Sequence, residues 1–212
     1  MNIRYTIKFN SMISVINAGI GNFNSIHNML NKLRVESVLT DSYDVISKSK
    51  YVILPGVGSF DKFVTSLRKL KINLAIENAV NDNKSKLLGI CVGMQVLFNT
   101  SDEGIEKGLS LIDGYVSKFN KNLNISVPHM GWNNIKQKKE NVLFSNKKFE
   151  RFYFAHSYHC ICNNEDDILT TTFYGDEFVS SVNKNNIYGF QFHPEKSHQY
   201  GRLFLENFCF GE

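Results

Sequence analysis

Short apolar runs separated by helical patterns mark the first half of the chain, and this alternation constrains the fold more than any other feature. The runs cover residues 12–18, 35–39, 51–54 and 87–90, and hydrophobic side chains at helical spacing follow the first and the third of them. Buried strands that alternate with helices usually form a parallel sheet with helices on both faces. The sequence therefore predicts an α/β fold with a central, mostly parallel sheet flanked by helices.

The second half of the chain has a different pattern. From about Gly108 onward the sequence contains short β-rich pieces at 109–119, 142–144, 152–162, 168–173, 178–182 and 187–192, and a last helical pattern covers 199–208. These pieces predict additional antiparallel strands. Because there is no Pro- or Ser-rich linker and no internal repeat, we expect one domain over 12–212, preceded by an N-terminal extension of unknown role at 1–11 unless Met12 is the natural start.

Composition excludes several classes of protein. Charged residues are 21% of the chain and hydrophobic residues 42%, a balance that excludes a disordered or low-complexity protein. No apolar run approaches the roughly 20 residues of a membrane span. The net charge of +4 comes from basic residues scattered in short groups, which is typical of solvated faces and not of a nucleic-acid site.

Cysteine usage indicates a reducing compartment. Four cysteines in 212 residues are too few for a disulfide scaffold, and residues 1–11 lack the apolar core of a secretory signal, so we expect a cytoplasmic protein. Cys160 and Cys162 form one C-x-C pair without a second ligand pair, which does not make a zinc site. We expect two strand residues there, and no metal and no cofactor.

Cys91 lies in a motif that presents a side chain for chemistry. Residues 89–93 read Gly-Ile-Cys-Val-Gly and follow an apolar strand, and small residues two positions before and after the cysteine are typical of a nucleophile elbow. A helical run expected at 94–98 would favour the thiolate and would offer the Val92 N–H to an oxyanion. The motif indicates acyl transfer through Cys91, and the alternative is a small buried hydrophobic residue.

A base and a group to orient it lie near the end of the chain. In an extended segment His193 and Glu195 project to the same side, where the carboxylate can hold the imidazole in one tautomer. Because Cys91 and His193 each end a strand, and open α/β sheets place their sites at the carboxyl edge, we expect the two to meet there. The alternative for a lone His-Pro-Glu is an ordinary turn.

A second glycine-containing turn follows the strand at 51–54. Residues 55–60 read Pro-Gly-Val-Gly-Ser-Phe, and the backbone N–H of Val57 or Gly58 could provide the second donor of an oxyanion hole. Glycine lets a peptide change its orientation there at little steric cost. The alternative is a plain strand-to-helix loop.

Taken together, these motifs resemble a known family. The segments PGVGSF (55–60), GICVGMQ (89–95) and FHPEKS (192–197) resemble the class I, or triad, glutamine amidotransferases over nearly the whole chain after Met12. The segment PHMGWN (128–133) is similar to the signature of the glutaminase subunit of imidazole glycerol phosphate synthase. The resemblance implies the single-domain amidotransferase fold and glutamine hydrolysis through a thioester on Cys91, with His193 as acid and base and Glu195 as its orienter.

The resemblance also implies a substrate site and a partner. The substrate glutamine would be held by Gly58, Gln95, Ser157 and Tyr158. The partner interface would contain His129, Trp132, Asn133 and Lys196. The implied partner is a (β/α)₈-barrel cyclase subunit, which would form a heterodimer with this chain and use the ammonia to make imidazole glycerol phosphate in histidine biosynthesis.

Two departures leave the ammonia acceptor open. The first loop reads Asn17-Ala18 before its first glycine, where the family commonly has an Asp-Tyr pair. Lys196 is followed by Ser197-His198, which is similar to a paralogous branch that supplies ammonia for amidation of a surface sugar. A glutaminase subunit of that branch is therefore the alternative function.

Proteins of two other classes fit the sequence less well. Gly19 and Gly21 follow the first strand and Asp41 lies about 20 residues beyond, as in dinucleotide-binding oxidoreductases, but Asn24 replaces the third glycine of that fingerprint. A catalytically idle binding subunit is disfavoured by the intact Cys91, His193 and Glu195.

Overall fold

The structure is a computed structural model that describes residues 12–82, 84–120, 124–144 and 151–211. The N-terminal extension expected at 1–11 lies outside the described residues. Within the described residues, no helix combines the length and the hydropathy that a bilayer span requires.

The elements of the chain are as follows. The helices are α1 (Phe23–Lys32), α2 (Tyr43–Lys48), α3 (Phe60–Lys69), α4 (Ile72–Asn81), α5 (Val92–Gln95) and α6 (His198–Phe210), with 3₁₀ helices η1 (Val142–Phe144), η2 (Glu165–Asp167) and η3 (Pro194–Lys196). The strands are β1 (Ile13–Ile16), β2 (Ser37–Thr40), β3 (Tyr51–Gly56), β4 (Lys86–Cys91), β5 (Thr100–Ser101), β6 (Gly114–Lys118), β7 (His129–Asn134), β8 (Lys136–Gln137), β9 (Arg151–His156), β10 (Tyr158–Cys162), β11 (Ile168–Tyr174), β12 (Asp176–Lys184) and β13 (Ile187–Phe190).

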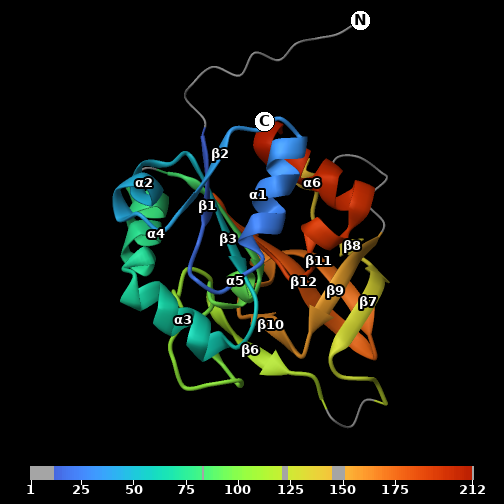
Figure 1. Cartoon of the computed structure of the whole chain (residues 1–212). Coiled ribbons are helices and arrows are strands. Elements are labelled where there is room, and N and C mark those ends of the chain that lie inside the picture. The colour runs from blue at the N-terminus through green and yellow to red at the C-terminus, as the bar shows by residue number, and fades with distance from the viewer. Residues whose placement is uncertain (1–11, 83, 121–123, 145–150, 212) are drawn as a thin grey trace, which may run out of the picture.

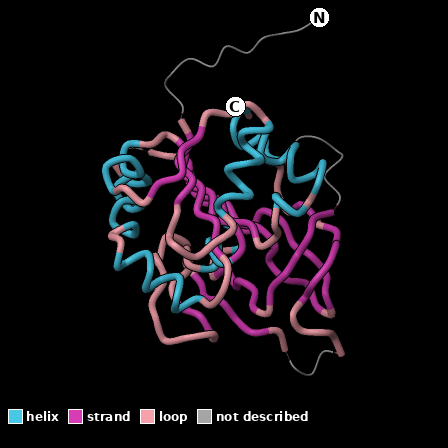
Figure 2. The backbone as a smooth tube through the Cα atoms, in the orientation of Figure 1, coloured by secondary structure: helices cyan, strands magenta, loops and turns pink. Residues whose placement is uncertain are grey.

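A parallel block forms one half of the main sheet. Its strands follow the order β2-β1-β3-β4-β13, and each neighbouring pair is parallel. Helices α2, α3 and α4 lie on one side of β1 and β3, and α1 and α6 lie on the other (Figure 1). Figure 2 shows the same arrangement, with strands running between the two groups of helices. The expected α/β fold with a mostly parallel sheet is confirmed.

Antiparallel strands complete the sheet, as expected for the second half of the chain. Strand β12 pairs antiparallel with β13, β10 pairs with β12, and β6 pairs with β10. Strands β7 and β9 form a separate antiparallel ladder in which His129 lies opposite His156. This ladder lies beside the carboxyl edge of the parallel block (Figure 1), and residues of both its strands line a pocket there.

Two local predictions are wrong, and one helix lies where the sequence predicts none. Residues 142–144 form the 3₁₀ helix η1 and not a strand, because the Asn141 side chain and backbone hold them in a turn. Only Gly114–Lys118 of the piece expected at 109–119 is a strand, since residues 109–112 donate hydrogen bonds to the carbonyls of residues 96–98, directly after α5. Helix α2 was not predicted; it is only six residues long.

Aromatic packing fixes the segment that leads into His193. The rings of Phe152 and Phe192 stack at 4.0 Å, and those of Phe190 and Phe204 meet edge to face at 4.5 Å. All four side chains are fully buried. Burying such a side chain contributes up to about 3 kcal/mol, so the cluster anchors the chain between β13 and η3 against α6 and β9.

Candidate active site

The site lies at the carboxyl ends of three neighbouring parallel strands. Strand β4 runs between β3 and β13, with Gly56 paired to Cys91 on one side and Phe190 paired to Ile90 on the other. The turn at 57–59 follows β3, Cys91 ends β4, and the segment that leads to His193 follows β13. The sheet thus brings together three motifs that lie far apart in the sequence.

Cys91 is held in a strained turn by glycines on both sides. Its φ of 55° and ψ of −113° are rare for a residue with a side chain, and α5 begins at the next residue. A Cβ on Gly93 would lie 1.9 Å from the Leu54 carbonyl oxygen, and one on Gly89 would lie 2.5 Å from that of Gly93. The turn can therefore form only where strand, helix and neighbouring strand approach backbone to backbone.

The helix after Cys91 is shorter than the sequence predicts. It ends at Gln95 and not at 98, because the N–H groups of Leu109 and Leu111 bond to the carbonyls of Val96 and Leu97. One helical turn carries little macrodipole, so it gives a thiolate only weak support. A neighbouring side chain gives the sulfur a further hydrogen bond, since Gln191 Nε2 donates to Cys91 Sγ at 3.7 Å.

His193 and Glu195 form a hydrogen-bonded pair beside Cys91. The His193 Nδ1–H donates to Glu195 Oε1 at 2.9 Å. Burial opposes charge on the ring, but attraction to Cys91, a hydrogen bond to it and the contact with Glu195 outweigh burial and raise the pKa of His193 to about 10. These interactions favour a charged imidazolium beside Cys91.

The carboxylate partner is held on a 3₁₀ helix. Residues Pro194–Lys196 form η3, so the extended geometry expected for this segment is wrong, although the two side chains still meet. Burial disfavours the charged carboxylate, but hydrogen bonds from His193 and Asn22 outweigh it and lower the pKa of Glu195. The Asn22 side-chain amide donates to Glu195 Oε1 at 3.0 Å.

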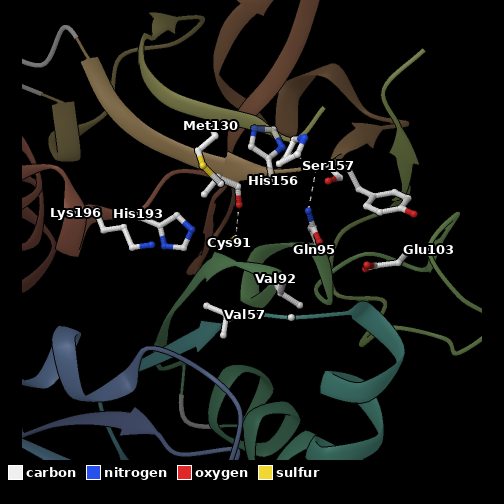
Figure 3. A pocket seen from close by; sticks show the side chains of 14 residues that line it. Val57, Cys91, Val92, Gln95, Glu103, Met130, His156, Ser157, His193 and Lys196 are labelled. Carbon is white, nitrogen blue, oxygen red and sulfur yellow. Dashed lines mark hydrogen bonds between the residues drawn. The ribbon is translucent and has the colours of Figure 1, made fainter. Parts of the chain in front are cut away.

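A cavity of about 310 Å³ opens beside the Cys91 thiol (Figure 3). Its lining includes Val57, Gly58, Val92, Gln95, Ser157 and Tyr158, all predicted from the sequence to bind substrate or oxyanion, together with Cys91 and His193. Figure 3 shows His193 and Lys196 on one side of Cys91 and Gln95 and Glu103 on the other. The size suits a single small molecule.

Comparisons with known proteins identify the family. The family model described as "Glutamine amidotransferase class-I" matches residues 14–211. This chain belongs to the class I glutamine amidotransferases.

Two relatives of this amidotransferase carry the name of the same enzyme subunit. It is 46% identical over 198 residues, 93% of this chain and 98% of the relative, to "Imidazole glycerol phosphate synthase subunit HisH 2" of Methanococcus maripaludis. It is 38% identical, over 93% of this chain and 99% of the relative, to "Imidazole glycerol phosphate synthase subunit HisH" of Leptospira borgpetersenii.

Solved structures share the fold of this amidotransferase. PurLQS from Thermotoga maritima matches with a TM-score of 0.72 and 17% identity, over 93% of this chain and 97% of that one. A glutamine amidotransferase from the same organism matches with a TM-score of 0.62 and 14% identity, over 95% and 83% of the two chains.

Glu103 is a pocket residue of the amidotransferase that sequence reasoning missed. Its Oε2 accepts the Phe60 N–H at 2.8 Å, which fixes the carboxylate at the start of α3. The Asp61 carboxylate accepts the N–H groups of Ile105 and Glu106, so the loop that carries Glu103 is tied to the same helix. No local motif signals this role, because it depends on contacts between α3 and a distant loop.

Gln191 and Asn22 were also missed. Both are amides that contact the triad, one at the sulfur and the other at the carboxylate. Gln191 lies in the segment GFQFHPEK, where alternation with Phe190 and Phe192 is the available signal, because it places the amide on the opposite side from two buried rings.

The residues expected at the partner interface divide into two groups. Trp132 is 39% exposed and stacks on His198 at 5.6 Å, and Lys196 is exposed beside the pocket. Asn133 is half-buried and donates to the Phe173 carbonyl. His129 is only 3% exposed, so its ring forms little of the surface of this chain, and its place at a partner interface stays a prediction. Its ring stacks on Tyr174 at 3.9 Å, inside the protein.

The C-x-C pair lies in strand β10, as expected. Burial raises the pKa of the Cys160 thiol well above its usual range and that of Cys162 to about 12. These two thiols are therefore poor nucleophiles.

Proposed function

We propose that this chain is the glutaminase subunit of imidazole glycerol phosphate synthase, hydrolysing glutamine to glutamate and ammonia for histidine biosynthesis. The observation that carries the proposal is the meeting of Cys91, His193 and Glu195 at one edge of a class I amidotransferase sheet. The names of the relatives that match over 93% of the chain support the pathway.

The first half of the reaction forms the thioester. The Cys91 thiolate attacks the side-chain amide carbon of glutamine, and the negative charge moves to the carbonyl oxygen. The N–H of Val92 and one from the Val57–Gly58 turn are the donors for this oxyanion, since all three residues line the cavity beside Cys91. His193 then gives its proton to the departing ammonia.

The second half releases glutamate. With its proton gone, His193 takes one from a water molecule, and the resulting hydroxide attacks the thioester carbon. The sulfur leaves as a thiolate and the imidazole regains its charge. Glu195 keeps the ring in one orientation in both halves, because its carboxylate accepts from the Nδ1 atom of the ring and leaves the Nε2 atom to exchange protons.

The cavity supplies groups for the polar ends of glutamine. Glu103 is an acidic residue of the lining opposite His193, so it is the natural partner for the α-ammonium group. Gln95, Ser157 and Tyr158 form the adjoining wall and would hold the rest of the substrate.

Ammonia must leave the site without meeting bulk water. In water near neutral pH it is mostly protonated and is no longer a nucleophile. We therefore infer direct transfer to a (β/α)₈-barrel cyclase that docks over the pocket. Lys196 and Met130 belong to the pocket lining, and Trp132 and Asn133 follow Met130 on β7. The test is capture of the partner from extract of the native cell with the full chain as bait. Recovery of a barrel cyclase supports the proposal, and recovery of a sugar-modifying synthase contradicts the pathway.

A genetic test separates the two acceptors. A histidine auxotroph that lacks its own glutaminase subunit is expected to grow when it carries this chain with its cyclase. Lack of growth despite good expression would favour the alternative, ammonia supply to a surface sugar, which the Ser197-His198 pair suggested.

A further inference from the structure

Two buried histidines behind the pocket are not used in the mechanism above. His129 lies on β7 and His156 lies opposite it on β9, and their side chains are 3% and 5% exposed. His129 Nδ1 and His156 Nε2 are 3.0 Å apart. His156 also lines the cavity (Figure 3).

The direction of each hydrogen bond in this pair can be worked out. His156 Nδ1 lies 2.8 Å from the Tyr158 carbonyl oxygen, which can only accept, so Nδ1 carries the proton. In a neutral ring the Nε2 atom of His156 is then an acceptor, and its partner His129 Nδ1 must donate. His129 Nε2 is left as an acceptor, and the Asn133 amide donates to it at 3.3 Å.

Both rings are neutral at physiological pH. Burial lowers the pKa of His129 to about 4, and burial also lowers that of His156 to about 3 despite its hydrogen bond to Tyr158. The tautomer assignment therefore holds near pH 7, and every polar atom of the two rings has a partner.

The same carbonyl links the histidines to the substrate site. The Tyr158 oxygen accepts a second hydrogen bond, from Gln95 Nε2 at 3.1 Å. Gln95 Nε2 also donates to Gln191 Oε1 at 3.0 Å, and Gln191 Nε2 donates to the Cys91 sulfur. A continuous chain of hydrogen bonds thus runs from Asn133 on β7 to the pocket wall and the nucleophile.

We propose that His129 and His156 are positioning residues that hold the Tyr158 carbonyl, and through it the Gln95 side chain, in the geometry that receives glutamine. This proposal rests on the proposed glutaminase function. Neither ring touches the reacting atoms, so loss of the pair is expected to weaken substrate binding more than it slows the chemistry.

The first experiment examines the rings without using the enzyme reaction. The full chain labelled with ¹⁵N histidine is studied by NMR at pH 7. Both rings are expected to be neutral and protonated on Nδ1. An Nε2-protonated or charged ring at either position would overturn the proposal, whether or not the chain proves to be a glutaminase.

The second experiment uses matched variants in the complex with the cyclase. His129→Leu removes the donor to His156, and we expect KM for glutamine to rise about 10-fold with kcat within about 3-fold of the wild type. His129→Asn places an amide donor near the Nδ1 position and is expected to return KM to within about 3-fold. His27→Leu is the matched control, because His27 lies on α1, hydrogen-bonds to Ser37 and is not part of the pocket lining.

The outcomes distinguish positioning from general stability. A wild-type KM in folded His129→Leu, or equal loss in the Leu and Asn variants, would overturn the proposal. If the wild-type complex releases no glutamate at all, the proposed function fails, and the NMR result still decides whether the hydrogen-bonded pair exists as described.

Discussion

The two sides of the pocket are built by different means. On one side the strand ends of β3, β4 and β13 carry Cys91 and lead to His193, and backbone register and close glycine contacts set their positions. On the other side β7, β9 and the start of β10 form a wall in which the His129 and His156 side chains and the Tyr158 backbone carbonyl are joined by hydrogen bonds. The Gln95 side chain of α5 donates to the same carbonyl.

This difference separates two kinds of function. A backbone ladder holds its groups to fractions of an ångström, which suits a nucleophile and its base. A wall made of side chains and loops can be adjusted at single positions, which suits the recognition of a substrate or a partner. Changes on the strand-end side should therefore lower kcat, and changes on the wall or the loops around it should mainly alter KM or Kd.

The largest effect is expected from Cys91→Ala. Without the sulfur no thioester forms, and glutamine-dependent turnover of the complex should fall by at least about 10⁴-fold. Synthesis supported by added ammonium salt at alkaline pH should be unchanged, because the cyclase receives ammonia directly. The measurement is product formation from each nitrogen source, and equal loss of both would contradict the assigned role.

Glu195→Gln tests the strand-end side of the pocket through the pH dependence of kcat/KM. In the wild type the pKa of His193 is raised from 6.5 to about 10, so the imidazolium is retained until the pH rises through 10, where kcat/KM should fall. Removing the carboxylate charge lowers that pKa, so the alkaline limb should move to lower pH and kcat should drop about 10²-fold or more. Glu206→Gln on α6, whose carboxylate lies 3.5 Å from Arg202, is the control. An unmoved alkaline limb would argue against the His193–Glu195 pair.

Trp132→Ala tests the outer face of the wall. An exposed aromatic residue stacked on His198 and flanked by Arg151 has the character of an interface hot spot. We expect the Kd for the cyclase to rise about 30-fold, which corresponds to about 2 kcal/mol. Calorimetric titration measures the change, and Leu74→Ala, a half-exposed residue on α4, should leave it unaltered.

Glu103→Gln should have the smallest effect of the four. The amide keeps a hydrogen-bonding oxygen but loses the charge that would pair with the substrate ammonium, so KM should rise about 10-fold while kcat stays close to the wild type. Glu106→Gln changes a carboxylate in the same loop that faces Arg68 outside the pocket lining. If both variants have the same KM, Glu103 does not recognise the substrate.

The strand-end side is also the side that the sequence predicts well. The elbow at 89–93 and the turn at 55–60 are local signals, and alternating strands and helices predict the shared edge that brings them together. The pairing of β13 beside β4 does not follow from local pattern, because an antiparallel strand, β12, precedes it. The expectation that Cys91 and His193 meet came from the rule that open α/β sheets place their sites at the carboxyl edge, and it did not specify which strands are neighbours.

The wall depends on contacts that no local pattern carries. Residues 109–112 have the composition of a strand, yet their N–H groups donate to the carbonyls of residues 96–98, which follow α5. His129 lies in a segment that resembles an interface signature, yet its ring is enclosed by Phe154 and Tyr174. The conformation of residues 109–112 and the burial of the His129 ring depend on contacts with residues that are distant in the sequence.

Register at the strand ends limits how related sequences can diverge in length. Because β4 is paired on both sides, one residue inserted within β4 or β13 would turn the following side chains to the opposite face and separate the sulfur from the imidazole. Loops that join these strands through helices carry no such restriction. Gaps in an alignment of functional homologues should therefore collect in those connections and spare the three strands.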